Sequence, residues 1–317
     1  MVKVGVIGCG AMGANHARIY SLMKGTEFIG VADSDRNRAE AVAERFKTKA
    51  FGDYKEMIGK VDAVSVAVPT AVHYKVAKEF LEAGIDVLLE KPIAETVEQA
   101  NELIGITEAS GRVLMIGHVE RFNPAILELS NIVTKPVHIE ARRFSPYDTR
   151  IKSGIVLDLM VHDLDIVMSL AGAPIKKITS MCVSVKPESP TEDLAQASLL
   201  FENGVTASLI ASRVHQNKVR NLNVAEDKMY TTVDYMKQEV VINRYVSADM
   251  INDGEVKYRQ EVITEIPFLR HRGEPLWIEL EHFIECVTNR SEPMVTARQG
   301  RDVLKTAYDI VAAGALG

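Results

Sequence analysis

The sequence predicts an α/β protein of two domains. We expect a doubly wound parallel sheet over residues 1–121 and an α+β domain with a large, open, mainly antiparallel sheet over residues 122–317. Short apolar runs alternate with helix-like stretches in the first 117 residues, which is typical of a parallel sheet covered on both faces. Strand-like segments follow one another directly after about residue 135. At 317 residues the chain is also long for a single core.

Five apolar runs define the strands expected in the first domain: VKVGVIG, EFIGVAD, DAVSVAVP, DVLLE and RVLMIGH. Between them, apolar residues recur at i, i+3, i+4 and i+7, the spacing of one helix face. These stripes are Ala39, Val42, Ala43 and Phe46, then Val72, Val76, Ala77, Phe80 and Leu81. Gly84 suits the end of the second helix, because glycine adopts the left-handed conformation of a C-terminal cap.

The second domain is expected to begin after HVERFNP and to contain six strands: PVHIEARRF, ITSMCVSVK, AQASLLF, VTASLIAS, VRNLNVAE and EVVINRYV. Asn203-Gly204 and Asp253-Gly254 are strong hairpin signals, since both residue pairs favour tight turns with positive φ. Two helices close the chain, and Leu276, Leu280 and Phe283 share an apolar face on the first of them.

A glycine-rich loop follows the first strand and precedes a helical stretch. Its sequence is GCGAMG, in which Gly8, Gly10 and Gly13 make the G-x-G-x-x-G pattern. The three glycines allow a tight turn, close approach of the backbone to a pyrophosphate, and close packing of helix on strand. The helix start, at Ala11 and Met12, offers N–H groups to the phosphates. The pattern predicts a Rossmann-type dinucleotide-binding domain.

An acidic residue ends the second strand, 20 residues after Gly13. There Asp33 can accept hydrogen bonds from the ribose hydroxyls of the cofactor. A carboxylate repels a 2′-phosphate, so we expect NAD rather than NADP. The cations Arg36 and Arg38 lie close by and could reverse that preference.

The composition excludes several classes of protein. A net charge of −6 gives no general attraction to nucleic acid or anionic membranes. No basic helix, aromatic stacking surface or membrane-spanning apolar run stands out. Cys9, Cys182 and Cys286 are odd in number and lack the spacing of a metal site. We therefore expect a reduced, cytoplasmic protein that binds no metal.

A lysine directly follows the fourth strand, in the segment EKPIA (Glu90–Ala94). Together with GCGAMG, VPTAVH, GHVERFNP and DLMVHDLD, this segment resembles the Gfo/Idh/MocA oxidoreductases over nearly the whole chain. The resemblance implies that Lys91, Asp158 and His162 are catalytic. It also implies that Pro69, Thr70, Glu90 and Lys91 border the cofactor and that the Lys91–Pro92 bond is cis. Thr70 and Met160 stand where the family usually has asparagine and glycine.

The residue pattern agrees with that assignment. Asp158, His162 and Asp165 stand at i, i+4 and i+7 of an otherwise apolar segment, so a helix would place them on one face. Histidine can take the proton of an alcohol near neutral pH, and a lysine ammonium can stabilise an alkoxide. His73, after the third strand, borders the nicotinamide ribose or is a surface residue at a helix start.

Segment 142–152 suggests the substrate. This segment contains four basic residues and one acidic residue, which gives it a local charge of +3. The basic residues are Arg142, Arg143, Arg150 and Lys152, and the acidic residue is Asp148. Such a cluster suits a phosphorylated substrate or is a solvated surface. The segment, with Arg121 in GHVERFNP, is similar to the family branch that oxidises UDP-N-acetylhexosamines at C3. We expect Lys91, Arg121, Arg142, Arg143, Arg150, Asp158 and His162 to bind the sugar nucleotide.

Two alternatives remain open at this point. The substrate could be a free polyol or aldose such as inositol or glucose. From another class, the chain could be a non-catalytic dinucleotide-binding regulator, although such a protein needs no proton-transfer residues. Leu200 and other apolar residues on the outer face of the second sheet predict a homodimer or homotetramer formed through that sheet.

Overall fold

The computed structural model describes residues 1–148, 153–185, 191–252 and 255–314, with the backbone alone at residues 247–252 and 255–260. These residues form two compact units. Unit 1 comprises Met1–Phe122 and Gly273–Lys305, and unit 2 comprises Asn123–Arg272 and the chain from Thr306 onward. The units change at Phe122, beside the expected boundary after residue 121. Residues 273–305, which we expected in the second domain, belong to unit 1.

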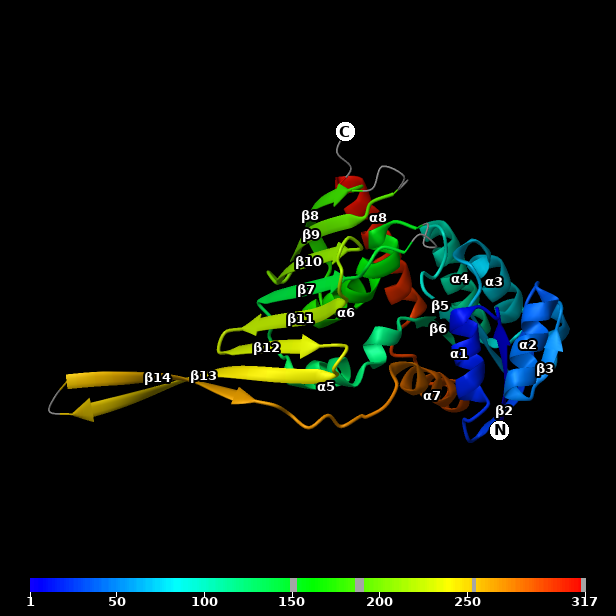
Figure 1. The fold of residues 1–317 in the computed structure, drawn as a ribbon, viewed down its shortest axis with the longest axis horizontal. Coiled ribbons are helices and arrows are strands. Elements are labelled where there is room, and N and C mark those ends of the chain that lie inside the picture. Colours follow the sequence, from blue (N-terminus) through cyan, green and yellow to red (C-terminus); the bar gives the residue numbers. More distant parts are fainter. Residues whose placement is uncertain (149–152, 186–190, 253–254, 315–317) are drawn as a thin grey trace. The chain divides into compact units, whose positions relative to one another are not determined.

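A parallel sheet forms the centre of unit 1 (Figure 1). Its strand order is β3-β2-β1-β4-β5-β6, and the sheet is doubly wound, as the sequence predicted. The strands are β1 (Val2–Ile7), β2 (Thr26–Ala32), β3 (Lys49–Phe51), β4 (Ala63–Val66), β5 (Asp86–Glu90) and β6 (Leu114–Gly117). Strand β3 was not predicted from the sequence, because three residues are too few to show an alternating pattern.

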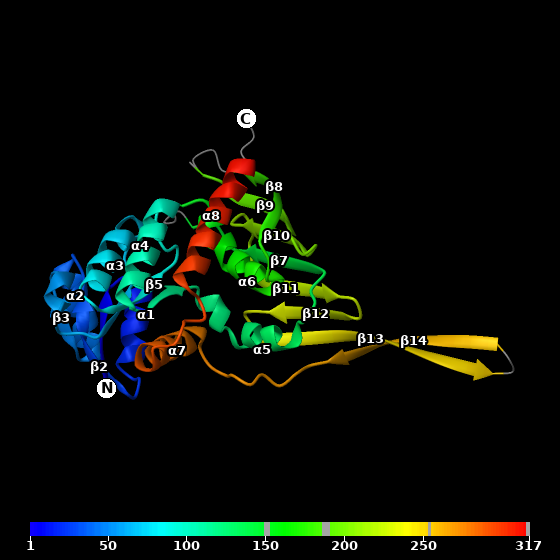
Figure 2. The same cartoon turned by 180° about the vertical axis from the view of Figure 1, so that it is seen from behind.

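Helices cover both faces of this sheet (Figures 1 and 2). They are α1 (Ala11–Tyr20), α2 (Arg36–Phe46), α3 (His73–Glu82), α4 (Val97–Ser110) and α7 (Pro275–Asn289), with the short helices η1 (Tyr54–Met57), η2 (Thr70–Val72) and η3 (Val119–Phe122). The predicted stripes on α2 and α3 are confirmed at Ala39, Val42, Val76 and Phe80, which are buried. Val72, the expected first residue of the second stripe, is 38% exposed and lies in η2, before α3 begins. Gly84 follows α3 with a φ of 77°.

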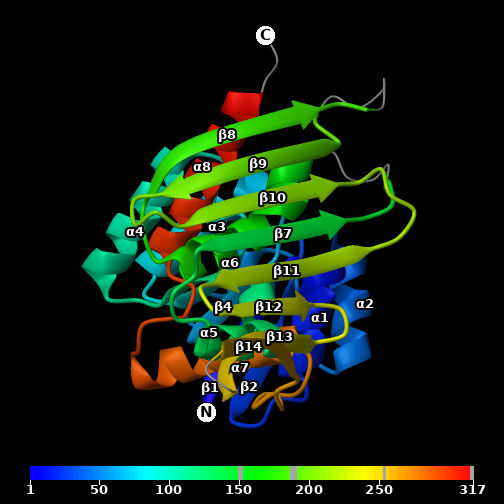
Figure 3. The same cartoon turned by 90° about the vertical axis from the view of Figure 1, so that its left-hand side faces the viewer.

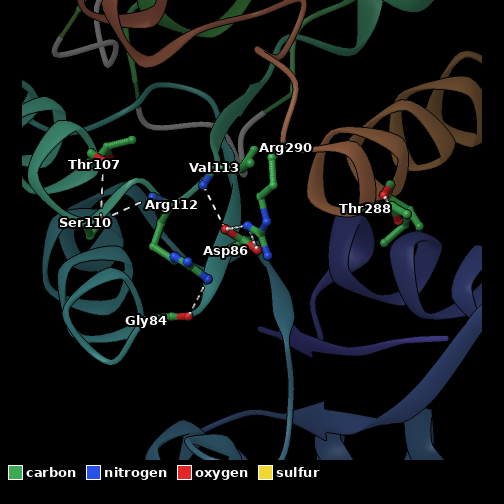
Figure 4. A network of polar contacts seen from close by, with 9 residues as sticks. Gly84, Asp86, Thr107, Ser110, Arg112, Val113, Thr288 and Arg290 are labelled. Atoms are coloured by element: carbon green, nitrogen blue, oxygen red, sulfur yellow. Dashed lines mark hydrogen bonds and ion pairs between the residues drawn. The ribbon is translucent and has the colours of Figure 1, made fainter.

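Helix α7 explains why residues 273–305 belong to unit 1. It buries Leu276, Leu280 and Phe283, and its neighbours include η3, α1 and β1. Beyond its last turn, Arg290 adopts a φ of 55° and pairs with the fully buried Asp86 at the start of β5. Figure 4 shows this pair, in which Arg290 Nη1 lies 2.7 Å from Asp86 Oδ2 while the Val113 N–H donates to Oδ1.

Unit 2 is built on an eight-stranded sheet with the order β14-β13-β12-β11-β7-β10-β9-β8 (Figure 3). The strands are β7 (His138–Phe144), β8 (Ile175–Val183), β9 (Leu194–Phe201), β10 (Thr206–Ser212), β11 (Val219–Glu226), β12 (Met229–Asp234), β13 (Glu239–Asn252) and β14 (Glu255–Glu265). Neighbouring strands pair antiparallel except for β7 and β10. The expected mainly antiparallel sheet is confirmed, although β12 and β14 were not predicted as strands.

Both hairpin signals lie between antiparallel strands. Asn203-Gly204 joins β9 to β10, and Gly204 has the positive φ, 88°, that the turn requires. Asp253-Gly254 lies outside the described residues, but Asn252 and Glu255 on either side are paired. One face of the sheet carries α5 (Pro124–Ile132) against β12 and β13, and α6 (Val161–Ala171) against β7 and β10 (Figure 3).

The second half of α8 (Ala297–Gly314) lies beside β8, where Ser180 Oγ donates a hydrogen bond of 2.6 Å to the Ile310 carbonyl. Among the described residues, no helix is both long and apolar enough to cross a membrane.

Arg290→Ala should lower the free energy of unfolding by about 2 kcal/mol, because it removes a charged partner from the buried carboxylate of Asp86. The matched control is Arg298→Ala. Arg298 pairs with Glu108 between two largely exposed side chains, so its loss should cost less than about 1 kcal/mol. Urea denaturation of both variants measures the difference, and equal losses would contradict the role given to Arg290.

Candidate functional site

The glycine loop after β1 is tightly constrained at two of its glycines. Gly8 has a φ of 92°, and a Cβ built on it would lie 2.3 Å from the Ala67 carbonyl oxygen. A Cβ on Gly13 would lie only 1.7 Å from the carbonyl oxygen of Gly8. Only glycine fits these two positions, which brings the start of α1 directly onto the carboxyl end of β1.

The middle glycine has the opposite environment. A Cβ on Gly10 would meet no atom within 4 Å, and the next residues, Ala11 and Met12, are exposed. Gly10 caps α1 without a side-chain hydrogen bond, so the N–H groups of the first helical turn are available to an anion. This open backbone fits a pyrophosphate group.

A cleft of about 690 Å³ opens beside this loop, at the carboxyl ends of β1, β2 and β4. It brings together five of the predicted cofactor residues, namely Gly8, Gly10, Asp33, Arg38 and Pro69. Its lining also includes Ser34, Asp53, Tyr54, Val72 and Lys75, which the sequence did not suggest. Asp53 and Tyr54 follow β3, so finding them depends on recognising that short strand.

Asp33 is held in place at the end of β2. Its Oδ2 accepts a 2.7 Å hydrogen bond from the Cys9 N–H of the glycine loop, and its Oδ1 accepts one from the Asp35 N–H. Arg38 Nη1 lies 3.5 Å from Oδ2 and is half exposed. Burial, and then the negative charge of Asp33, raises the pKa of the Cys9 thiol to about 12, so this thiol stays neutral.

The segment after β5 places Lys91 next to a buried charge. Glu90 is 8% exposed, and its Oε1 lies 3.1 Å from His16 Nε2 on α1. The Lys91 N–H donates to Glu90 Oε2, and the Lys91–Pro92 bond is cis. Burial alone would raise the pKa of Glu90, but the hydrogen bond to His16, the electrostatic interaction with His16 and the positive charge of Lys91 lower it. Glu90 is therefore an anion beside the Lys91 ammonium.

His73 is neither exposed nor part of the cleft lining. It is 1% exposed at the start of α3, with Nδ1 2.7 Å from the Pro92 carbonyl oxygen and Nε2 2.8 Å from that of Val68. Burial lowers its pKa more than the two carbonyl groups raise it. The surface alternative is thus wrong, and His73 joins the loop after β4 to the turn that carries Lys91. The nearby Thr70 is partly buried at the start of η2.

Asp158 and His162 lie in unit 2 at a change of helix type. Residues Val156–Met160 form a π-helix, η4, in which the Val161 N–H contacts the Val156 carbonyl, and α6 follows directly. Asp158 and His162 are partly exposed, whereas Asp165 is 2% exposed. The uniform α-helical spacing that we expected does not hold over η4, because π-helical turns contain more residues.

The predicted basic segment is largely charge-paired where the structure describes it. Arg142 contacts Glu140 on the exposed surface of β7. Arg143 is 1% exposed, forms two hydrogen bonds of 2.8 and 2.9 Å to Asp163, and stacks over Tyr235. Arg150 lies outside the described residues. Arg121, in unit 1, donates to the Met294 carbonyl at 3.4 Å.

Two family models match the chain. Residues 2–118 match the model of an oxidoreductase family with an NAD-binding Rossmann fold (GFO_IDH_MocA), and residues 131–228 match the GFO/IDH/MocA C-terminal domain. UDP-N-acetylglucosamine 3-dehydrogenase of Acidithiobacillus ferrooxidans is 31% identical over 98% of this chain and 96% of its own. A solved structure of the enzyme of that name from this organism covers 98% of this chain and 97% of its own, with a TM-score of 0.87.

More distant relatives are also similar. The scyllo-inositol 2-dehydrogenase (NAD⁺) of Bacillus subtilis is 24% identical over 93% of this chain and 89% of its own. The structure of myo-inositol 2-dehydrogenase from Lactobacillus plantarum shares the fold, with a TM-score of 0.80 at 19% identity over 99% of this chain and 97% of its own. The chain belongs to the Gfo/Idh/MocA oxidoreductase family, and its cofactor is a nicotinamide dinucleotide.

The two glycines give a matched pair of substitutions. Gly13→Ala should lower the free energy of unfolding by about 3 kcal/mol or more, because its methyl group overlaps a carbonyl oxygen. Gly10→Ala should cost less than about 1 kcal/mol, since Gly10 already has a φ of −69° and an open surrounding. Instead, the Gly10→Ala methyl group should weaken NAD binding about tenfold or more by crowding the pyrophosphate.

Chemical denaturation and calorimetric titration with NAD separate these two effects. If Gly10→Ala bound NAD with unchanged affinity, the cofactor would not cross the loop as described.

Proposed function

We propose that the chain is an NAD-dependent dehydrogenase that oxidises the C3 hydroxyl of UDP-N-acetylglucosamine, or of a related UDP-N-acetylhexosamine, to a ketone. The observation that carries the proposal is the 31% identity to a UDP-N-acetylglucosamine 3-dehydrogenase across 98% of this chain. That similarity extends through the segments expected to bind the sugar, from GHVERFNP to DLMVHDLD.

In the proposed reaction, different residues accept the proton, stabilise the developing charge and orient the reacting groups. NAD supplies the hydride acceptor. His162 takes the hydroxyl proton, because imidazole can accept a proton near neutral pH. The Lys91 ammonium stabilises the negative charge that develops on the oxygen, and the neighbouring Glu90 anion favours its charged form. Asp158 orients the reacting pair.

We propose NAD as the preferred cofactor because Asp33 stands at the end of β2. Its carboxylate is fixed by the Cys9 and Asp35 N–H groups, so it cannot easily turn away from a 2′-phosphate. Arg38 offsets part of that charge from 3.5 Å. If calorimetry showed tighter binding of NADPH than of NADH, Arg38 would dominate and this preference would be wrong.

The diphosphate of the substrate would be bound by Arg121, Arg142 and Arg150. Charge-assisted hydrogen bonds from such residues would favour a sugar nucleotide over a free sugar. Arg143 takes a different part in this proposal. Because its guanidinium already pairs with buried Asp163, it supports the packing of α6 on β7 next to the catalytic segment.

A free polyol is the second candidate substrate. The observation in its favour is the similarity to the scyllo-inositol 2-dehydrogenase, at 24% identity over 93% of the chain. Such a substrate has no diphosphate to engage a basic segment, so the two candidates differ in their need for Arg142 and Arg150.

We also propose that the chain forms a homodimer or homotetramer through the unit 2 sheet and works in the cytoplasm. Large apolar side chains are exposed on its strands, including Met181 at 56%, Val262 at 65% and Ile263 at 47%. Covering them stabilises an assembly. The three cysteines are free, which suits a reducing compartment. A monomeric mass by light scattering at micromolar concentration would contradict the assembly.

Incubating the protein with NAD and UDP-N-acetylglucosamine should produce NADH when an amine trap removes the ketone. The trap is needed because oxidation of an alcohol by NAD near neutral pH is usually uphill. Absorbance at the NADH band follows the reaction, with inositol and glucose as parallel substrates. NADH formation with inositol or glucose but not with any UDP-sugar would transfer the assignment to the second candidate.

Lys91→Ala and His162→Ala should each reduce kcat in this assay by roughly 10²–10⁴-fold. Binding of NAD, measured by calorimetry, should change little, since the cleft beside the glycine loop, which neither side chain lines, holds the larger part of the cofactor in this proposal. A variant that kept its turnover would remove that residue from the catalytic set.

A further inference from the structure

Unit 1 contains a buried polar cluster of which the proposed chemistry uses only Glu90. Its members are His16, Tyr20, Ser65, Glu90 and Glu279. We call it the internal acid cluster. Glu279, His16 and Ser65 are fully buried, and Tyr20 is 2% exposed. His16 Nε2 contacts Glu90 Oε1 at 3.1 Å, and Tyr20 and Ser65 share a 2.8 Å hydrogen bond between their hydroxyl groups.

Glu279 is the unusual member of this cluster. It lies on the buried face of α7, and neither of its carboxylate oxygens has a hydrogen-bond partner among the described residues. Burial, and then the negative charge of Glu90, raises the pKa of Glu279 well above its ordinary value. His16 and Lys91 favour the ionised form of Glu90. Glu279 is fully buried and has no hydrogen-bond partner among the described residues to stabilise a charge, so the environment favours its neutral form.

The groups that interact electrostatically with Glu279 come from two other elements. Strand β5 contributes Glu90, and helix α1 contributes Tyr20, whose hydroxyl group is neutral. Glu120, which is 7% exposed, lies on η3, a neighbour of α7. The negative charge of the Glu90 carboxylate opposes the ionisation of Glu279. A cation close to Glu90 would offset its negative charge and would therefore make the ionisation of Glu279 less unfavourable.

The cofactor brings such a cation. In a doubly wound sheet the dinucleotide lies along the carboxyl ends of the strands, and Glu90 is the last residue of β5. The nicotinamide ring is positively charged when oxidised and neutral when reduced. We propose that Glu279 holds a proton in the free protein and releases it when the oxidised nicotinamide ring binds at the end of β5.

In this role, Glu279 changes the affinity of the protein for NAD⁺ relative to its affinity for NADH. Because a proton leaves on binding, NAD⁺ should bind more tightly as the pH rises, by up to about tenfold per pH unit for a full proton. NADH brings no ring charge, so its affinity should not follow the same pH dependence. The inference rests on cofactor binding in unit 1 and needs no sugar substrate.

Calorimetric titrations in two buffers with different ionisation enthalpies measure the protons released per cofactor bound. The wild-type protein should release a measurable fraction of one proton with NAD⁺ and none with NADH. Glu279→Gln, which mimics the neutral acid in shape, should bind NAD⁺ without that release. Glu281→Gln is the matched control, since Glu281 is exposed two residues further along α7, and it should behave as the wild type does.

Equal proton release by wild type and Glu279→Gln would overturn the proposal and point to Lys91 or His73 as the source. Absence of release from the wild type would overturn it without any variant. Glu279→Met, of similar size and without a titrating group, takes the place of Glu279→Gln if the latter does not fold. Failure of sugar oxidation in the trapped assay would leave these titrations unaffected, so the two proposals can fail separately.

Discussion

The contact between the turn after β1 and the start of α1 is the constraint on which unit 1 depends. A Cβ on Gly13 would lie 1.7 Å from the Gly8 carbonyl oxygen. The helix therefore packs against the turn more closely than a residue with a side chain would allow. This contact presents the first turn of α1 to the cleft at the carboxyl edge of the sheet. It also sets the course of α1, whose later residues His16 and Tyr20 are buried. The proposed phosphate site and the hydrogen bond from His16 to Glu90 therefore depend on the same packing.

Strand β5 shows how a distant part of the chain completes this unit. At its amino end, the buried Asp86 pairs with Arg290, and at its carboxyl end Glu90 opposes the ionisation of Glu279. Both partners come from α7 or the residue after it, and Arg290 lies 204 residues after Asp86 in the chain. Lys91 follows directly. The strand that precedes the proposed catalytic lysine thus interacts with a helix that is not part of the nucleotide-binding sequence motif.

The sequence was sufficient for features that depend on local pattern. The glycine loop, the acid at the end of β2, the stripes on α2 and α3 and the Asn203-Gly204 turn all follow from spacing and residue type. Features that depend on tertiary pairing could not be predicted. The sequence did not show that Arg143 pairs with Asp163. It also did not show that both ring nitrogens of His73 lie close to carbonyl oxygens. Glu279 did leave a signal, an acid on the apolar face shared by Leu276, Leu280 and Phe283, but such a signal does not identify the acid's neighbours.

The central claim is that hydride leaves C3 of a UDP-N-acetylhexosamine and reaches the cofactor bound beside the glycine loop. The most direct test uses UDP-N-acetylglucosamine carrying deuterium at C3, with NAD and an amine trap, followed by mass spectrometry of the recovered NADH. The account predicts NADH one mass unit heavier, together with a slower rate than with unlabelled substrate where hydride transfer limits turnover. Unlabelled NADH, formed while the deuterium stays in the sugar product, would show that another carbon is oxidised and would contradict the account.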